Sequence, residues 1–314
     1  MGKRVLAACI LLMLGGCAFA DIRTGLTGYW KFDENTGTTT ADSSGNVYPG
    51  YRGNLISSPV WAQGYTNSDL NFFSGGYVDI NVPLGSFMSA STGTMAGWMY
   101  IIAGNGSGAD GSCGGISDAQ TSNGGYIWLC AAADGYFYAG GYSSSNQWVR
   151  AQSTLNTWKH LAWVHGGGNL FLYVDGNKVG PLALGNLLKV DQNMTISRGF
   201  NGLGIKGLVD EVRIYNRALS DSDINELYYC QPPTIVGKDW VIDRNTNCDL
   251  NAAIYPATSV AIGKNLDIRN GTLNINSNQL LAVPSGSKAY VRAYNGAFSS
   301  KIWLRTGGKL MVRK

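Results

Sequence analysis

The segment Gly207-Leu208-Val209-Asp210-Glu211-Val212-Arg213-Ile214-Tyr215-Asn216-Arg217-Ala218-Leu219-Ser220 decides how this 314-residue chain folds. Positions 208 to 215 include the β-forming residues Val209, Val212, Ile214 and Tyr215 and hold no glycine or proline, which predicts a strand. Side chains alternate along a strand, so Asp210 and Glu211 are expected on opposite sides of it. At least one of these acids is then expected near the buried side or at a strand end, where it needs a partner.

A helix is predicted directly after this strand. Ser220 suits the N-cap, and Asp223 follows three residues later, in the position of a capping-box acid. Ile224, Leu227 and Tyr228 form an apolar stripe at helical spacing. The pattern therefore predicts that the domain ends with one helix.

The same segment resembles the closing strand of laminin-G-like domains in the concanavalin A-like lectin/glucanase superfamily. Four other stretches resemble motifs of that family and follow one another in its order: residues 28–34, 41–46, 158–164 and 170–176. The resemblance covers about residues 25–229. It implies an all-β fold, a two-sheet concanavalin A-like jelly-roll sandwich in which the first and last strands come together.

Composition agrees with an all-β chain. The 43 glycines and the low content of charged residues, 14%, favour many turns between short strands. Short β-forming runs alternate with Gly, Asn and Ser turns through residues 21–230 without interleaved helices, which indicates a sandwich. Residues 105–125 are too long and too glycine-rich for an ordinary connection, so a functional or mobile loop is expected there.

The chain is expected to hold two domains. Pro232-Pro233 marks the boundary, because neither residue continues a helix or a central strand. Residues 21–230 form the predicted jelly roll. Residues 231–314 form a small β domain of short runs punctuated by Asn-Gly, Ser-Gly and Gly-Gly. Evenly spaced runs of this kind fit a small sandwich or a short β-solenoid, and the sequence leaves both open.

Charge also separates the two domains. Residues 231–314 hold 11 Lys and Arg against 4 Asp and Glu, whereas residues 21–230 hold 11 against 16. A basic domain suits contact with a polyanion, and a solvated basic face is the alternative. No specific nucleic-acid motif is present, so the polyanion of an exported protein would be an acidic glycan, a lipid headgroup or extracellular DNA.

Residues 1–20 have the form of a secretory signal. Lys3 and Arg4 precede an apolar run, residues 5–14, that is too short to span a bilayer. Ala18-Phe19-Ala20 is a cleavage site of the A-x-A type, whereas Leu14-Gly15-Gly16-Cys17 resembles a bacterial lipobox that would lipidate Cys17. Cleavage after Ala20 is favoured, because a lipoprotein usually has a polar spacer after its cysteine and here the domain begins almost directly after Cys17. Both routes of processing predict an extracytoplasmic protein. The sequence has no second apolar segment of the kind that would predict a transmembrane helix.

Four cysteines remain after the signal: Cys113, Cys130, Cys230 and Cys248. An even number in an exported chain indicates disulfides, and four cysteines allow three connectivities. Sequential pairing, Cys113 with Cys130 and Cys230 with Cys248, closes the shorter loops and is the prediction. No two cysteines have the C-x-x-C spacing of many zinc sites.

Catalytic spacing is absent from the predicted strands. Retaining glycosidases need two carboxyls about 5–5.5 Å apart, which alternate positions of one strand can supply. The acids of the relevant strands are neighbours or stand alone: Asp33-Glu34, Asp175 and Asp210-Glu211. His160 and His165 are the two histidines of the chain, and their odd spacing puts them on opposite faces. We therefore predict that the protein is not an enzyme, with a glycan-active hydrolase as an alternative.

The family resemblance also implies a structural calcium ion. Related jelly rolls hold one where the opening strand, its loop and the closing strand meet, and the matching positions here are Asp42, Asn46 and Asp210. Calcium takes six to eight oxygen ligands, and carbonyls of that loop could complete the set. The alternative is that Asp42 makes an Asx-turn while Asp210 pairs with Arg213 or a backbone amide.

Aromatic residues supply the candidate ligand contacts. Sugar sites stack aromatic rings on sugar faces beside polar groups, and the candidate rings are Tyr136, Tyr138, Tyr142 and Trp148, near Asn146 and Gln147. Every other strand residue of a sandwich faces inward, so the same rings could instead fill the core. That is the expected place of Trp30, Trp98 and Trp163.

The predicted function is therefore recognition. We expect a non-catalytic extracytoplasmic protein that binds a glycan or a cell-surface protein, in the manner of an adhesin. A structural subunit of a surface assembly, whose strand edges pair with neighbours, is the second hypothesis.

Overall fold

The computed structural model describes residues 22–45, 53–57, 59–118, 127–187, 190–199 and 202–231, and the backbone of ten short strands between residues 240 and 312. The predicted signal segment and its cleavage and lipidation sites lie outside these residues. None of the helices in this described part is long and apolar enough to cross a membrane.

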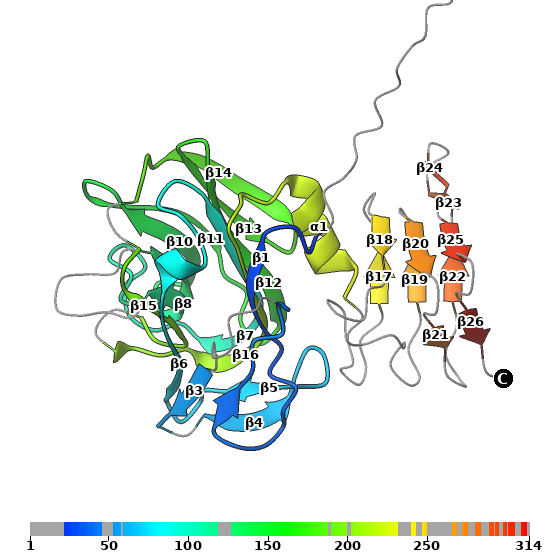
Figure 1. Cartoon of the computed structure of the whole chain (residues 1–314), viewed down its shortest axis with the longest axis horizontal. Helices are drawn as coiled ribbons and strands as arrows, with labels where there is room; N and C mark the ends of the chain where they lie inside the picture. Colours follow the sequence, from blue (N-terminus) through cyan, green and yellow to red (C-terminus); the bar gives the residue numbers. More distant parts are fainter. Residues whose placement is uncertain are drawn as a thin grey trace, which may run out of the picture.

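Two antiparallel sheets form a sandwich (Figure 1). The closing sheet, named for its central strand β16, runs in the order β14-β13-β12-β7-β16-β5-β4, and β1 also pairs with β16. Its strands are β1 (Leu26–Trp30), β4 (Val60–Gln63), β5 (Ser68–Asn71), β7 (Gly93–Ala103), β12 (Trp158–Gly166), β13 (Asn169–Val174), β14 (Asn177–Ala183) and β16 (Lys206–Tyr215). Trp30 of β1 lies opposite Val212 of β16. The first and last strands therefore come together as the sequence predicted.

The second sheet is called the platform sheet, and it runs in the order β11-β10-β9-β8-β15-β6-β3-β2. Its strands are β2 (Thr39–Thr40), β3 (Gly53–Ile56), β6 (Tyr77–Pro83), β8 (Gly114–Asp118), β9 (Ile127–Ala131), β10 (Tyr136–Tyr142), β11 (Asn146–Gln152) and β15 (Asn193–Ile196), and the short 3-10 helix η1 (Leu84–Ser86) follows β6. Strand β8 lies inside the segment that the sequence assigned to one long loop. That prediction was wrong for residues 114–118, which pair with β9 on one side and with β15 on the other.

The core between the sheets follows from the alternation of side chains. Trp30 and Trp163 lie in it as predicted. Trp98 is also buried, but it lies on the opposite face of the closing sheet, where its ring stacks on Tyr65 with 3.5 Å between the centroids. The closing sheet is therefore covered on both faces.

The closing strand departs from regular alternation at its two acids. Strand β16 shifts register against β7 between Asp210 and Arg213, and Glu211 has a φ of 58°. Thr66 donates its backbone N–H to Asp210 Oδ2 at 2.9 Å and its hydroxyl to Glu211 Oε1 at 2.9 Å. Both carboxyls thus reach one residue on the same side of the strand. The prediction of opposite sides was wrong, because a bulge interrupts the alternation.

Helix α1 (Asp221–Tyr229) follows the closing strand as predicted. Ser220 is its N-cap and forms a capping box with Asp223. Ile224 and Leu227 are buried in a second apolar cluster on the outer side of the closing sheet. The helix therefore forms part of a third layer over that sheet.

The described strands of the C-terminal domain pair mostly in parallel (Figure 1). Three parallel sets are formed by β17 (Trp240–Ile242), β19 (Leu266–Ile268) and β22 (Ala289–Val291); by β18 (Asn247–Asp249), β20 (Thr272–Ile275) and β25 (Lys301–Leu304); and by β21 (Leu280–Val283) and β26 (Lys309–Val312). Strands β23 (Ala293–Tyr294) and β24 (Phe298–Ser299) form an antiparallel pair. Stacking of successive parallel strands is the arrangement of a β-solenoid, one of the two folds that the sequence left open.

Trp240 connects this domain to the jelly roll. Its indole Nε1 donates to the carbonyl of Tyr229 at 2.6 Å, and its side chain is buried. The basic side chains proposed to contact a polyanion lie outside the described residues, so that contact stays a prediction.

Candidate ligand-binding surface

The hairpin of β10 and β11 brings the predicted ligand residues together. Its register pairs Tyr138 with Arg150, Gly140 with Trp148, and Tyr142 with Asn146. Phe137 and Ala139, which alternate with the tyrosines, face the core, so the tyrosines face outward. We call the outward residues Tyr136, Tyr138, Tyr142, Trp148 and Arg150 the outer platform.

Exposure differs within the outer platform. The side chain of Trp148 is 38% exposed, whereas Tyr138 is 3% exposed. Tyr136 and Tyr142 are half-buried. The tryptophan side chain is therefore partly accessible to a ligand, whereas the Tyr138 ring is not.

Arg150 organises the polar part of the platform. Its guanidinium lies 4.2 Å from the centroid of the Tyr136 ring, and Nη1 donates to the Tyr138 hydroxyl at 3.0 Å. The Tyr138 hydroxyl donates to Asp134 Oδ2 at 2.5 Å. Burial and this hydrogen bond raise the pKa of Tyr138, so its proton is retained. Sequence reasoning missed Arg150 and Asp134, although Arg150 stands two residues after Trp148 and must share its face.

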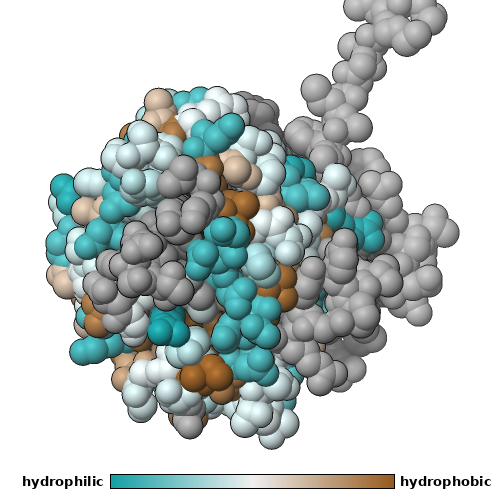
Figure 2. Space-filling model, turned by 60° about the vertical axis from the view of Figure 1, so that its left-hand side comes forward, coloured by the Kyte–Doolittle hydropathy of each residue, from teal (hydrophilic) through white to brown (hydrophobic). Residues whose placement is uncertain are grey.

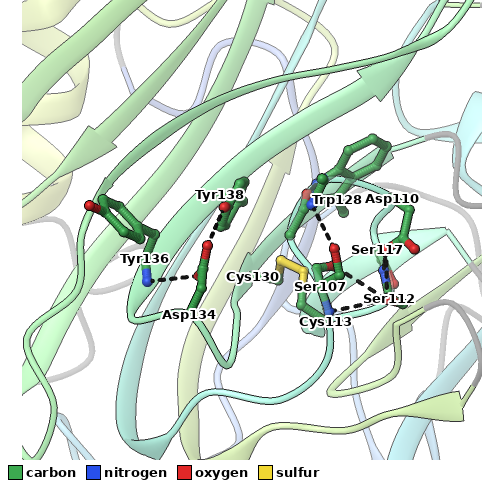
Figure 3. The surroundings of a disulfide bond; sticks show 12 residues. Ser107, Asp110, Ser112, Cys113, Ser117, Trp128, Cys130, Asp134, Tyr136 and Tyr138 are labelled. Atoms are coloured by element: carbon green, nitrogen blue, oxygen red, sulfur yellow. Dashed lines mark hydrogen bonds between the residues drawn. A yellow bond between two sulfur atoms is a disulfide. The ribbon is translucent and has the colours of Figure 1, made fainter.

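A glycine-rich strap, residues 104–112, borders the platform (Figure 3). The indole Nε1 of Trp128 donates to the carbonyl of Gly108 at 2.9 Å. A Cβ on Gly108 would lie 2.0 Å from the Tyr138 ring, so this position requires glycine. The strap therefore covers Trp128 and one side of the Tyr138 ring, whereas Trp148 is 38% exposed.

A disulfide fixes the strap to the sheet. Cys113 and Cys130 are bonded, as predicted, and their Cα atoms are 5.7 Å apart. Both side chains lie in a cluster with Trp128 and Tyr138. Cys230 is also disulfide-bonded, whereas the side chain of Cys248 lies outside the described residues, so its pairing stays a prediction.

Residues 73–225 match the family model of the concanavalin A-like lectin/glucanases superfamily. This part of the chain is a concanavalin A-like domain. The comparison with curated proteins found no match.

Solved structures share the fold of this domain at low identity. Domain 4 of AbnA, a GH43 extracellular arabinanase from Geobacillus stearothermophilus, is 20% identical, with a TM-score of 0.50 over 65% of this chain and 98% of that chain. The binding domain of botulinum neurotoxin serotype D is 15% identical, with a TM-score of 0.52 over 69% of this chain and 55% of that chain. The binding domain of Paraclostridial Mosquitocidal Protein 1 is 16% identical, with a TM-score of 0.50 over 67% and 53%. At these identities the likeness shows the fold alone.

The concanavalin A-like domain holds a second polar group at the bulge of β16, which we call the sealed cluster: Tyr29, Asp69, Asp210, Glu211 and Arg213. All five side chains are buried. Arg213 Nη2 donates to Glu211 Oε2 at 2.7 Å and to the Tyr29 hydroxyl at 2.7 Å, and that hydroxyl donates to Glu211. Arg213 thus pairs with Glu211, and an ionised Asp69 or Asp210 in the same buried group would bear an electrostatic cost.

The pKa values of the sealed cluster reflect that cost. Burial raises the pKa of Asp69 to about 8. Burial, together with the negative charge of Glu211, raises the pKa of Asp210 well above its usual range. Within the described residues neither carboxyl oxygen of Asp69 has a hydrogen-bond partner, and the same holds for Asp210 Oδ1. Asp69 is therefore held as a protonated acid at neutral pH unless a cation joins it, and the raised pKa of Asp210 favours its protonated form.

A polar cavity of about 460 Å³ lies beside the sealed cluster and is lined by Asp33, Asn35, Ala62, Gln63, Asn67 and Ser68. Burial and the charge of Glu211 raise the pKa of Asp33 to about 6. The cavity presents carboxyl, amide and hydroxyl oxygens.

The residues predicted to bind calcium divide between two hydrogen-bond groups. Asp42 accepts from the backbone N–H groups of Tyr29 and Ser44 and from the Ser44 hydroxyl, which is the Asx-turn of the alternative interpretation. Asp210 accepts from the Thr66 N–H and keeps one buried oxygen free of donors in the described part. Asn46 lies outside the described residues. No group of three or more His, Cys, Asp or Glu within them could hold a metal, and calcium stays a prediction.

The two histidines lie in the interior of the domain. His160 and His165 are fully buried. Burial, and then the positive charge of Arg213, lowers the pKa of His160 to about 3, so it is neutral at physiological pH. Its ring contacts Trp98 edge-on, with 5.4 Å between the centroids.

Proposed function

We propose that the concanavalin A-like domain binds a glycan on the outer platform, with Trp148 as the ring on which a sugar stacks. The observation that carries the proposal is the accessible Trp148 ring, 38% exposed, on the same sheet face as Tyr136, Tyr142 and Arg150. An aromatic ring buries the C–H face of a sugar, and neighbouring polar groups bind its hydroxyls.

One face of the described surface shows how its apolar residues are distributed. Figure 2 shows brown, hydrophobic residues as separate small groups among hydrophilic ones on the face in view. Scattered apolar residues of this kind are normal for a soluble surface. The outer platform differs because its aromatic ring lies beside a structured polar network.

Fold and compartment support the proposal. The arabinanase domain of similar fold was solved in complex with arabinotriose. The Cys113–Cys130 disulfide is compatible with an extracytoplasmic protein, where glycans of cell surfaces are accessible.

The test is a glycan array on the full chain, followed by calorimetry with Trp148→Ala. We expect this variant to weaken binding at least about tenfold, because a central tryptophan typically contributes more than about 1.4 kcal/mol. Phe73→Ala is the control, since Phe73 is 41% exposed and lies just after β5 of the closing sheet. Equal loss in both variants would contradict the platform.

Two further outcomes separate the alternatives. Saturable glycan binding that survives Trp148→Ala would move the site elsewhere. No glycan binding, together with a concentration-dependent assembly in light scattering, would instead support the structural subunit of a surface assembly.

A further inference from the structure

We infer that the glycan is acidic and that the guanidinium of Arg150 binds the carboxylate of a uronic acid whose ring lies on Trp148. This inference rests on the proposed function and names the chemical class of its ligand.

Arg150 has donors to spare. A guanidinium carries five N–H groups in a planar fork. Nη1 donates to the Tyr138 hydroxyl at 3.0 Å and, at 3.4 Å, to Asp134 Oδ2. Within the described residues no acceptor contacts Nε or Nη2, and the side chain is 49% exposed. The free edge of the fork therefore faces solvent and can take both oxygens of a carboxylate.

The same guanidinium is held in place before a ligand arrives. Its face lies on the Tyr136 ring at 4.2 Å, and the Tyr138 hydroxyl fixes one nitrogen. That hydroxyl is in turn fixed by Asp134, at 2.5 Å. A side chain held in this way loses little conformational entropy on binding, which favours affinity for a carboxylate.

Asp134 does not neutralise this site. Its carboxylate accepts from the Tyr138 hydroxyl and from the Tyr136 backbone N–H, at 2.5 and 3.2 Å. Its contact with Arg150 is long, at 3.4 Å, and Asp134 is 43% exposed there. Exposed pairs of this geometry contribute little. Arg150 can therefore bind a ligand carboxylate without first breaking a strong ion pair.

The spacing of Trp148 and Arg150 fits a sugar acid. The two residues are alternate positions of β11, so their side chains share a face and their Cα atoms lie about 6.6 Å apart. A hexuronic acid carries its carboxylate directly on the ring. A ring stacked on Trp148 thus brings the carboxylate toward the free edge of Arg150, whereas a neutral hexose leaves that edge to water.

The experiment compares matched acidic and neutral ligands on the full chain. Polygalacturonate, alginate and a glucuronan are each tested beside their carboxyl-reduced forms by calorimetry. We expect at least one acidic form to bind about tenfold or more tighter than its reduced form. Arg150→Gln should bring that ratio below about threefold, and Arg150→Lys should recover only part of it, because an ammonium lacks the planar fork.

Arg198 offers the matched control. Its guanidinium also stacks on a tyrosine, 4.6 Å from the centroid of the Tyr77 ring. Tyr77 lies on β6, separated from β11 by four strands of the same sheet. Arg198→Gln should leave the preference for the acidic form unchanged.

The outcomes separate the two proposals. If carboxyl-reduced or other neutral glycans bind as tightly as acidic ones and Trp148→Ala still abolishes binding, the uronic acid inference is overturned and the proposed function stands. If no glycan of either kind binds, both are overturned. Equal loss of the acidic preference in Arg150→Gln and Arg198→Gln would overturn the role of Arg150.

Discussion

The outer platform and the sealed cluster are built from the same parts and differ in their access to water. Each holds an arginine stacked 4.2 Å from a tyrosine ring, Arg150 on Tyr136 and Arg213 on Tyr29, and each arginine contacts a carboxylate. Arg150 and Asp134 are 49% and 43% exposed, whereas Arg213 and Glu211 are 0% exposed.

That difference decides what each group can do. Water screens the charges of the outer platform, so its ion pair contributes little to stability and its donors remain free for a ligand. In the sealed cluster water cannot screen the charges. Removing one partner of an ion pair there leaves the other as an unpaired buried charge, which lowers the stability of the fold. The same side chains therefore support recognition in one place and determine stability and its pH dependence in the other.

The largest expected effect is at Asp69. Its pKa is raised from 3.8 to about 8, so between these pH values the folded state holds a proton that the unfolded state releases. Stability then falls by about 1.4 kcal/mol for each pH unit from about 4 to about 8 and is constant above that range. Asp69→Asn should remove this slope and make the protein more stable at pH 8, measured by urea unfolding of chelator-treated protein.

The control for Asp69→Asn is Asp191→Asn, which removes one negative charge from an exposed position. Its unfolding profile should follow that of the unmodified protein. An unchanged pH slope in Asp69→Asn would show that Asp69 is ionised in the fold and has a partner outside the described residues.

The second effect is the loss of the sealed cation. Arg213→Met leaves the buried carboxylate of Glu211 without its ion pair, which should cost about 3–5 kcal/mol in urea unfolding. Adding Glu211→Gln to this variant removes the stranded charge, so the double variant should be more stable than the single one. A double variant less stable than Arg213→Met would contradict this. It would show that the hydrogen bonds from Tyr29 and Thr66 to the Glu211 carboxylate stabilise the fold more than the unpaired charge destabilises it.

Much of this architecture could be predicted from the sequence, because the pattern that decides it is local. The β-forming run at residues 208–215 predicted the closing strand, and Ser220 with Asp223 predicted the capped helix. The tyrosines of β10 and Trp148 share one face of the platform sheet, as strand alternation implies, whereas the sequence left open whether that face was the surface or the core. The Cys113–Cys130 pairing was also correct.

The errors arose where a distant segment sets the local geometry. The bulge at Glu211 depends on Thr66, about 145 positions away in the chain, which contacts both acids. Tyr138 is buried because Gly108 of the strap lies against its ring. Arg150 is different, because strand alternation alone places it on the same face as Trp148. It was missed because only aromatic residues were considered as candidate ligand contacts.

The third prediction concerns the strap. The Cys113–Cys130 bond closes a loop of sequence separation 17, which should stabilise the fold by about 3 kcal/mol. Replacing both cysteines by alanine should lower stability by that amount and loosen the cover over Trp128, measured by urea unfolding and by quenching of tryptophan fluorescence. A loss below about 1 kcal/mol with unchanged quenching would show that the glycine contacts of the strap hold it without the disulfide.

The fourth prediction tests the calcium ion expected at the closing strand. A cation near the free oxygen of Asp210 would relieve the crowding of acids in the sealed cluster, and calcium at 100 times its dissociation constant would stabilise the fold by about 2.7 kcal/mol. Calcium added to chelator-treated protein should raise the melting temperature, and Asp210→Asn should abolish the rise. Asp42→Asn is the companion variant. If calcium still raises the melting temperature of this variant, the ion is bound by Asp210 without Asp42. The absence of any rise would contradict calcium binding.

The smallest effect on stability is expected at the exposed ion pair of Arg150 and Asp134, which is the counterpart of the buried pair of Arg213 and Glu211. Asp134→Asn removes the charge facing Arg150, 3.4 Å away, and leaves one carbonyl oxygen in place of the two carboxylate oxygens that accept from the Tyr138 hydroxyl and the Tyr136 N–H. Stability should change by less than about 1 kcal/mol, since exposed pairs rarely contribute more. Affinity for an acidic glycan should rise slightly, because one like charge is removed near the ligand carboxylate. A loss of several kcal/mol in urea unfolding would show that the platform pair is as essential as the sealed one, and that exposure does not separate the two groups.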